Sequence, residues 1–233
     1  MKRSDLPPYR FLRSVQENGL RRTISISISA LEDWWFDVKN GTDTAGIVNL
    51  EDLDVTGPRK QNGHRYQATS TRPLTAFLSD HPFPTDSVLV DFGSGKGKVL
   101  LVAAGYGFAR LVGVEFSPAL CAIARKNVSL AQRRAKIADR IHIVESDVVD
   151  YPIRPEENVF FFYNPFGEMV LNSVLRNILR SLEDRPRRIW CVYYSPGLPG
   201  RVYELGSRFV EVWHGIYFGS ELVVYSNEGN ACA

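Results

Sequence analysis

Three glycines in alternate positions follow an acidic residue in the segment Asp91-Phe92-Gly93-Ser94-Gly95-Lys96-Gly97-Lys98. Glycine has no Cβ, so the backbone can turn sharply there and a ligand can approach it closely. An acidic residue two positions before the first glycine suits a cationic group better than a diphosphate. The segment therefore predicts a loop that binds a positively charged ligand.

Spacing separates this loop from two phosphate-binding motifs that also use glycine. A dinucleotide fingerprint has a glycine three residues after its second one, where this chain has Lys98. A P-loop needs Ser or Thr after its Gly-Lys pair, where this chain has Val99. NAD and ATP are therefore disfavoured as ligands of this loop.

Two further acidic residues end predicted strands after the loop. Glu115 lies at about the distance where an acidic residue holds a ribose in doubly wound folds. Asp147 follows the next strand, where its carboxylate could accept a hydrogen bond from the amino group of adenine. Taken singly, either acid is more often a helix N-cap or a turn residue. Together with the glycine loop, they favour a nucleoside site.

The elements that must position these residues alternate between strand-like and helix-like segments from residue 87 onward, as in a parallel sheet built from βαβ units. Two closely spaced runs at the end of the chain, separated by Gly219-Ser220, predict an antiparallel hairpin. We therefore expect an α/β fold, a doubly wound, mostly parallel sheet in a three-layer α/β/α arrangement. The predicted strands are 87–92, 111–115, 141–144, 158–163, 188–194, 209–218 and 221–225, and the predicted helices are 74–78, 99–104, one from residue 117, and 170–182.

The N-terminal region has a different character. It contains an alternation of Ser and Ile over residues 24–28, an aromatic segment over 31–38, and many turn residues. We expect residues 1–75 to form an accessory or lid region and residues 76–233 to form the ligand-binding domain. Trp34, Trp35 and Phe36 are expected to pack against that domain, and a lid or a wall of the acceptor site is the alternative.

From about residue 70 to residue 233, the chain resembles the class I S-adenosylmethionine-dependent methyltransferases. The whole chain, including residues 41–44 and Arg65-Tyr66, is similar to uncharacterised bacterial methyltransferases. The run DFGSGKG and the helix after it show a weaker likeness to lysine methyltransferases outside the SET class. The resemblance implies a Rossmann-like, seven-stranded sheet whose last strand is antiparallel, with S-adenosyl-L-methionine as cofactor. It rests on DFGSGKG at 91–97, VGVEFSP at 112–118, ESD at 145–147 and YNPFG at 163–167.

The same resemblance implies a set of cofactor-binding residues. Asp91 would lie near the methionine amino group, Glu115 would hold the ribose, and Asp147 would hold the adenine. The other implied contacts are Gly93, Ser94 and Gly95 in the loop, Phe116 and Val148 on the adenine ring, Asn164, and Tyr66 and Thr69 in a segment that closes over the cofactor.

Asn164-Pro165-Phe166-Gly167 follows the fourth predicted strand, where these methyltransferases place the methyl acceptor. It partly matches the Asn-Pro-Pro-aromatic tetrapeptide of amino-group methyltransferases, with one proline in place of two. The resemblance thus implies that Asn164 orients the acceptor and that Phe166 shapes its pocket, as the catalytic residues. A strand-ending turn is the alternative interpretation.

Composition and charge limit the kinds of molecule that the protein is expected to bind. The 233 residues include 28 Lys and Arg against 26 Asp and Glu, a formal charge of +2, so charge does not indicate nucleic acid. No apolar run approaches the roughly 20 residues of a membrane span, and Cys121, Cys191 and Cys232 show no metal-ligand spacing.

We expect a cytoplasmic, metal-free enzyme that methylates an unidentified acceptor. An amine of a protein or small molecule is favoured over other acceptors. The alternatives are a non-catalytic regulatory module that binds the cofactor and a nucleic-acid methyltransferase, the latter with a basic face that Lys96, Lys98 and the Arg-rich helix from residue 117 would permit. The sequence does not indicate an oligomeric state.

Overall fold

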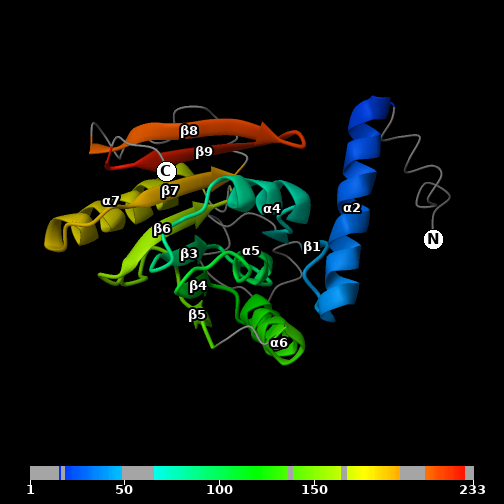
Figure 1. Ribbon diagram of the computed structural model, residues 1–233. Coiled ribbons are helices and arrows are strands. Elements are labelled where there is room, and N and C mark those ends of the chain that lie inside the picture. The colour runs from blue at the N-terminus through cyan, green and yellow to red at the C-terminus, as the bar shows by residue number, and fades with distance from the viewer. Residues whose placement is uncertain are drawn as a thin grey trace.

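A seven-stranded sheet forms the centre of the molecule (Figure 1). The computed structural model of the chain describes residues 16, 19–48, 66–135, 139–163, 167–194 and 208–228. Five neighbouring strands are parallel, and the last two form a hairpin in which β9 runs antiparallel to both β7 and β8. This topology confirms the predicted sheet. Across the sheet the order is β5 (Ile141–Glu145), β4 (Arg110–Glu115), β3 (Val88–Phe92), β6 (Glu157–Phe162), β7 (Trp190–Tyr194), β9 (Ser220–Ser226) and β8 (Val210–Tyr217).

Helices cover both faces of the sheet, which explains why β3 is apolar along nearly its whole length. One face packs against α4 (Thr71–Asp80), α5 (Lys98–Ala103) and α6 (Pro118–Ala135) through a core that includes Leu89 and Phe161. The other face packs against α7 (Glu168–Asp184) through a core that includes Val90 and Phe160. The expected three-layer α/β/α arrangement is therefore confirmed.

The start of this layered domain lies earlier than the sequence analysis expected. The helix predicted over 74–78 is α4, which runs from Thr71 to Asp80, so the expected boundary at residue 75 falls inside it. Pro73, Leu74 and Phe77 of α4 are buried, and Leu74 and Phe77 belong to the main core. All of α4 therefore packs as part of the layered domain.

The described part of the N-terminal region consists mainly of one long helix, α2 (Leu20–Asn40), which includes the Ser/Ile alternation. After it, β1 (Ile47–Val48) pairs antiparallel with β2 (Tyr66–Gln67). Figure 1 shows α2 at the side of the molecule, separated from the sheet by α4, α5 and α6. Phe36 packs against the core, but Trp34 and Trp35 are 55% and 59% exposed, so the expectation of packing was wrong for both tryptophans. None of the described helices is long and apolar enough to cross a membrane.

Candidate functional site

The glycine loop joins the end of β3 to α5 and folds back over the end of β4. Gly93, Gly95 and Gly97 have φ angles of +79°, +52° and +83°, a region that residues with a Cβ rarely adopt. The backbone N–H groups of Gly93 and Ser94 both donate to the carbonyl oxygen of Val114, at 2.9 and 3.1 Å. The alternate glycines are therefore required by the path of the backbone.

A fourth glycine, Gly113 in β4, makes room for this loop and was missed by the sequence analysis. It lies beside Asp91 in the strand register. A Cβ on Gly113 would lie 2.6 Å from Ser94 Oγ and 2.7 Å from Leu100 Cδ1, closer than any side chain tolerates. Ser94 thus packs directly onto the backbone of β4, which fixes the floor of the loop.

Glu115, at the end of β4, ties the glycine loop to the start of α6. Its Oε2 accepts a hydrogen bond from the backbone N–H of Gly95, and its Oε1 accepts one from the N–H of Ser117, both at 2.9 Å. Its side chain is buried. The N–H of Phe116 also donates a hydrogen bond to this carboxylate. A carboxylate has about four acceptor positions, so it keeps capacity to accept a further hydrogen bond from a ligand.

Asp91 lies next to this carboxylate and is also buried. Burial, followed by the negative charge of Glu115, raises the pKa of Asp91 to about 8. Burial also raises the pKa of Glu115, but backbone N–H donors from Ser117 and Gly95 oppose that rise. Near neutral pH, Asp91 therefore holds a proton. A cation brought to Asp91 would displace that proton.

Asp147 follows β5 and forms a tight turn. Its Oδ1 accepts from the backbone N–H of Val149 at 3.1 Å, and its carbonyl oxygen accepts from the N–H of Asp150 at 3.1 Å. Val148 is buried in the core beneath α7, and Phe116 is half-buried after β4. Asp147 therefore has the turn role that was the alternative to a ligand role.

Comparison with known proteins identifies the domain that contains these residues. Residues 90–185 match the family model of a methyltransferase domain. The chain therefore contains a methyltransferase domain, in line with its resemblance to the class I S-adenosylmethionine-dependent methyltransferases. The matched segment runs from β3 through α7 and includes the glycine loop, Glu115 and Asp147, whereas α2 lies outside it.

Solved structures share the fold of this methyltransferase. The Escherichia coli protein yhhF is 16% identical with a TM-score of 0.53, and the match covers 79% of this chain and 100% of that one. The glycopeptide N-methyltransferase MtfA, solved with S-adenosyl-L-methionine, is 13% identical with a TM-score of 0.53 over 67% and 92% of the two chains. A conserved hypothetical protein of Streptococcus pyogenes is 17% identical with a TM-score of 0.50 over 68% and 96%. No curated protein matches the sequence.

Both lysines of the methyltransferase's glycine loop are buried, which the sequence analysis did not anticipate. Lys98 Nζ lies 2.6 Å from Asp33 Oδ1 of α2, and the side chain of Lys98 is 2% exposed. Lys96 Nζ lies 2.8 Å from Asp43 Oδ1 and donates to the carbonyl oxygen of Ala45 at 3.2 Å. Lys96 and Lys98 therefore do not contribute to a basic face for nucleic acid, because both ammonium groups are engaged inside the protein.

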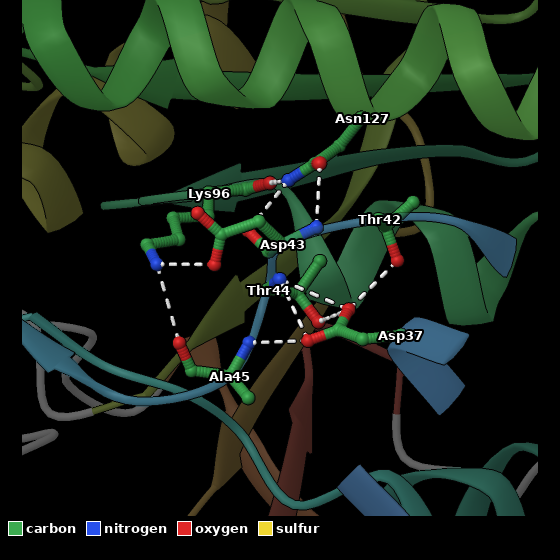
Figure 2. Close-up of polar contacts among 7 residues, drawn as sticks. All are labelled: Asp37, Thr42, Asp43, Thr44, Ala45, Lys96 and Asn127. Atoms are coloured by element: carbon green, nitrogen blue, oxygen red, sulfur yellow. Dashed lines mark hydrogen bonds and ion pairs between the residues drawn. The ribbon is translucent and has the colours of Figure 1, made fainter. Parts of the chain in front are cut away.

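Residues 42–45 are held between α2, α6 and the glycine loop (Figure 2). The carboxylate of Asp37 accepts from the N–H and hydroxyl of Thr44 at 2.8–2.9 Å and from the N–H of Ala45 at 2.8 Å. Asn127 of α6 accepts from the N–H of Asp43 and donates to its carbonyl oxygen, both at 2.9 Å, and also donates to the carbonyl of Lys96 at 3.1 Å. These contacts fix the N-terminal region onto the loop of the methyltransferase domain.

Two tyrosines meet where β6 and β7 end. The rings of Tyr163 and Tyr194 pack edge to face with centroids 4.9 Å apart, and the hydroxyl of Tyr194 donates to Ser220 Oγ at 3.0 Å. Burial raises the pKa of Tyr194 to about 12, so it stays neutral. Thr69 is buried just before α4. Asn164 and Phe166 lie outside the described residues, as does the side chain of Tyr66.

Proposed function

We propose that this methyltransferase binds S-adenosyl-L-methionine at the glycine loop and transfers its methyl group to an amine of a protein side chain or a small molecule. The observation that carries the proposal is the buried carboxyl pair Asp91 and Glu115. Glu115 is fixed through both oxygens, to the N–H of Gly95 in the loop and to the N–H of Ser117 before α6. Asp91 has a pKa of about 8, which a cation would lower.

The residues present fit this cofactor, which carries a sulfonium and an ammonium group. Asp91, buried and protonated in the free protein, supplies a carboxylate to a cationic group that lies beside it. Glu115 supplies an acceptor for a ribose hydroxyl. The remaining contacts in the proposal are those of the glycine loop (Gly93, Ser94, Gly95), of the adenine site (Phe116, Asp147, Val148) and of the covering segment and acceptor loop (Tyr66, Thr69, Asn164).

The cofactor supplies an activated methyl group, so the protein has to align the acceptor with it and exclude water. An amine acceptor must arrive neutral, since a protonated amine has no lone pair to attack with. Aromatic surroundings such as Tyr163 and Tyr194 disfavour the charged form of an amine by desolvation. Asn164 would orient that amine and Phe166 would pack against it.

Cofactor binding is expected to release a proton through Asp91. Its pKa of about 8 in the free protein means that it is protonated at pH 7, and a cation beside it lowers that pKa. Calorimetric titrations with S-adenosylmethionine at pH 7 in buffers of different ionisation enthalpy should therefore show release of about one proton per site. Affinity should rise with pH and level off above about pH 8.

The Asp91→Asn protein is the control for this effect. It should release no proton at pH 7 and bind the cofactor more weakly. Because the folded-state pKa of Asp91 lies above its usual value of 3.8, wild-type stability without cofactor falls as pH rises between these values. The variant should therefore be more stable than wild type at pH 8, by at least about 1 kcal/mol, or about 2–4 °C in Tm. Equal proton release by both proteins would exclude Asp91 as its source.

The acceptor assignment is tested by transfer of a labelled methyl group to lysine peptides, small amines and hydroxyl compounds, with products identified by mass spectrometry. We expect methylated amines.

Asn164→Ala should lower turnover at least about 100-fold, as loss of one positioned polar group does in other enzymes. Asn172→Ala on α7 is the matched control and should keep full turnover. Full turnover and normal cofactor binding in Asn164→Ala would refute its role.

We also propose a cytoplasmic location. Cys121 and Cys191 are buried free thiols, and burial raises the pKa of Cys121 to about 12. Unreactive free thiols suit a reducing compartment.

A further inference from the structure

Among the described side chains of helix α2, Asp33, Asp37 and Phe36 face the protein, whereas most of the apolar residues face outward. Its inward side chains include Asp33 and Asp37, which bind Lys98 and residues 42–45. Helices on the surface of a protein ordinarily show the opposite arrangement. The outward apolar residues of α2 are between 41% and 63% exposed. Six of them define the outer stripe, namely Leu20, Ile24, Ile28, Leu31, Trp34 and Trp35, and Val38 lies one turn after them.

The spacing of the outer stripe is that of a helix-pairing seam. From Leu20 to Trp34 its members follow one another by steps of four, four, three and three residues, with Trp35 beside Trp34. Such steps average close to the 3.5-residue repeat with which two helices interlock side chains along their length. A second helix with the same spacing is the natural partner, and a second copy of this chain supplies one.

The area of the outer stripe is also that of a dimer interface. Two partly exposed tryptophans and four aliphatic side chains expose on the order of 700 Å², taking 150–250 Å² for a whole aromatic side chain. This exceeds the patches of about 300–600 Å² usual on monomers and approaches the roughly 800 Å² that each partner buries in a specific complex.

The helix dipole selects the direction of pairing. An antiparallel pair opposes the two helix dipoles, whereas a parallel pair aligns them. A membrane surface is disfavoured, because helices that lie on membranes expose a basic polar face, whereas the described polar face of α2 holds carboxylates directed into the protein.

We propose that the outer stripe of α2 is the interface of an antiparallel homodimer, with Ile24 of one copy beside Leu31 of the other. This proposal does not depend on the cofactor or the acceptor. Since Asp33 and Asp37 of the same helix hold Lys98 and residues 42–45, the dimer would also brace the glycine loop of each copy.

Sedimentation velocity of the full chain across micromolar concentrations tests the proposal. Wild type should be a dimer, and Leu31→Glu combined with Trp35→Glu should be monomeric, with a dissociation constant at least about 100-fold higher. Met169→Glu combined with Ile216→Glu changes two exposed apolar residues elsewhere and should stay dimeric. A monomeric wild type, or a dimer that survives the change in the outer stripe, overturns the proposal. So does a monomer that binds anionic phospholipid vesicles.

Cross-linking tests the direction of pairing. In a background with Cys232→Ser, an oxidised mixture of Ile24→Cys and Leu31→Cys proteins should form the mixed disulfide, and neither variant alone should cross-link efficiently. Cross-linking of each variant to itself, with no preference for the mixed product, overturns the antiparallel arrangement.

Discussion

Replacing Asp33 with asparagine is expected to lower the free energy of unfolding by about 3–5 kcal/mol, because it removes the charge partner of a buried ammonium group. Lys98 is almost fully buried and its Nζ lies 2.6 Å from Asp33 Oδ1. The same oxygen accepts from the N–H and hydroxyl of Thr71 at the start of α4, and asparagine can keep those two bonds. The lost stability would therefore come from the unpaired charge of Lys98. Urea unfolding measures this loss.

Two controls separate this effect from a general weakening of α2. Glu32→Gln, one residue earlier, removes a half-exposed ion pair with Arg72 at 3.5 Å and should cost less than about 1 kcal/mol. Asp33→Asn combined with Lys98→Met removes both buried charges and should recover most of the lost stability. If Asp33→Asn and Glu32→Gln lowered the free energy of unfolding equally, the unpaired buried charge of Lys98 would not be the cause of the loss.

Glu115→Gln is expected to weaken cofactor binding at least about 100-fold, equivalent to about 2.7 kcal/mol. An amide has one acceptor oxygen, so its NH2 group must face the N–H of either Gly95 or Ser117. One buried donor then loses its partner, and one acceptor for a ribose hydroxyl is lost as well. Leaving such a donor unsatisfied should also cost about 1–3 kcal/mol of stability. Calorimetry with S-adenosylhomocysteine measures the affinity, and urea unfolding measures the stability.

Glu145→Gln is the matched control, because Glu145 is the neighbour of Glu115 in the strand register. Glu145 is exposed and pairs with Arg125 across 3.4 Å, so its substitution should change neither affinity nor stability appreciably. If Glu115→Gln behaved like Glu145→Gln, Glu115 would have no part in the site.

The sheet and its topology could be predicted from sequence because strands buried on both faces must be apolar over their length. Val88, Leu89 and Val90 show this directly, and the two residues between the closing runs allow only a hairpin. The positions of Glu115 and the glycine loop follow from the same logic, since parallel strands end at one edge of the sheet. Strand boundaries agree to within one or two residues.

The contacts between α2 and the glycine loop could not be predicted in the same way. Lys98 and Asp33 are far apart in sequence, and neither helical period nor glycine spacing indicates that a lysine is buried. The alternation of Ile and Ser over 24–28 has the period of a strand, yet it lies in a helix that Asp33 and Asp37 anchor through tertiary contacts. The three- and four-residue spacing from Leu20 to Trp35 was the available signal for that helix.

Calorimetric titration of the full chain with S-adenosylmethionine and its demethylated product is the most direct test of the cofactor site. We predict saturable binding of both compounds with one site per chain, weakened by Glu115→Gln and by Asp91→Asn. A folded protein that binds neither compound would contradict the proposal that Asp91, Glu115 and the glycine loop form this site.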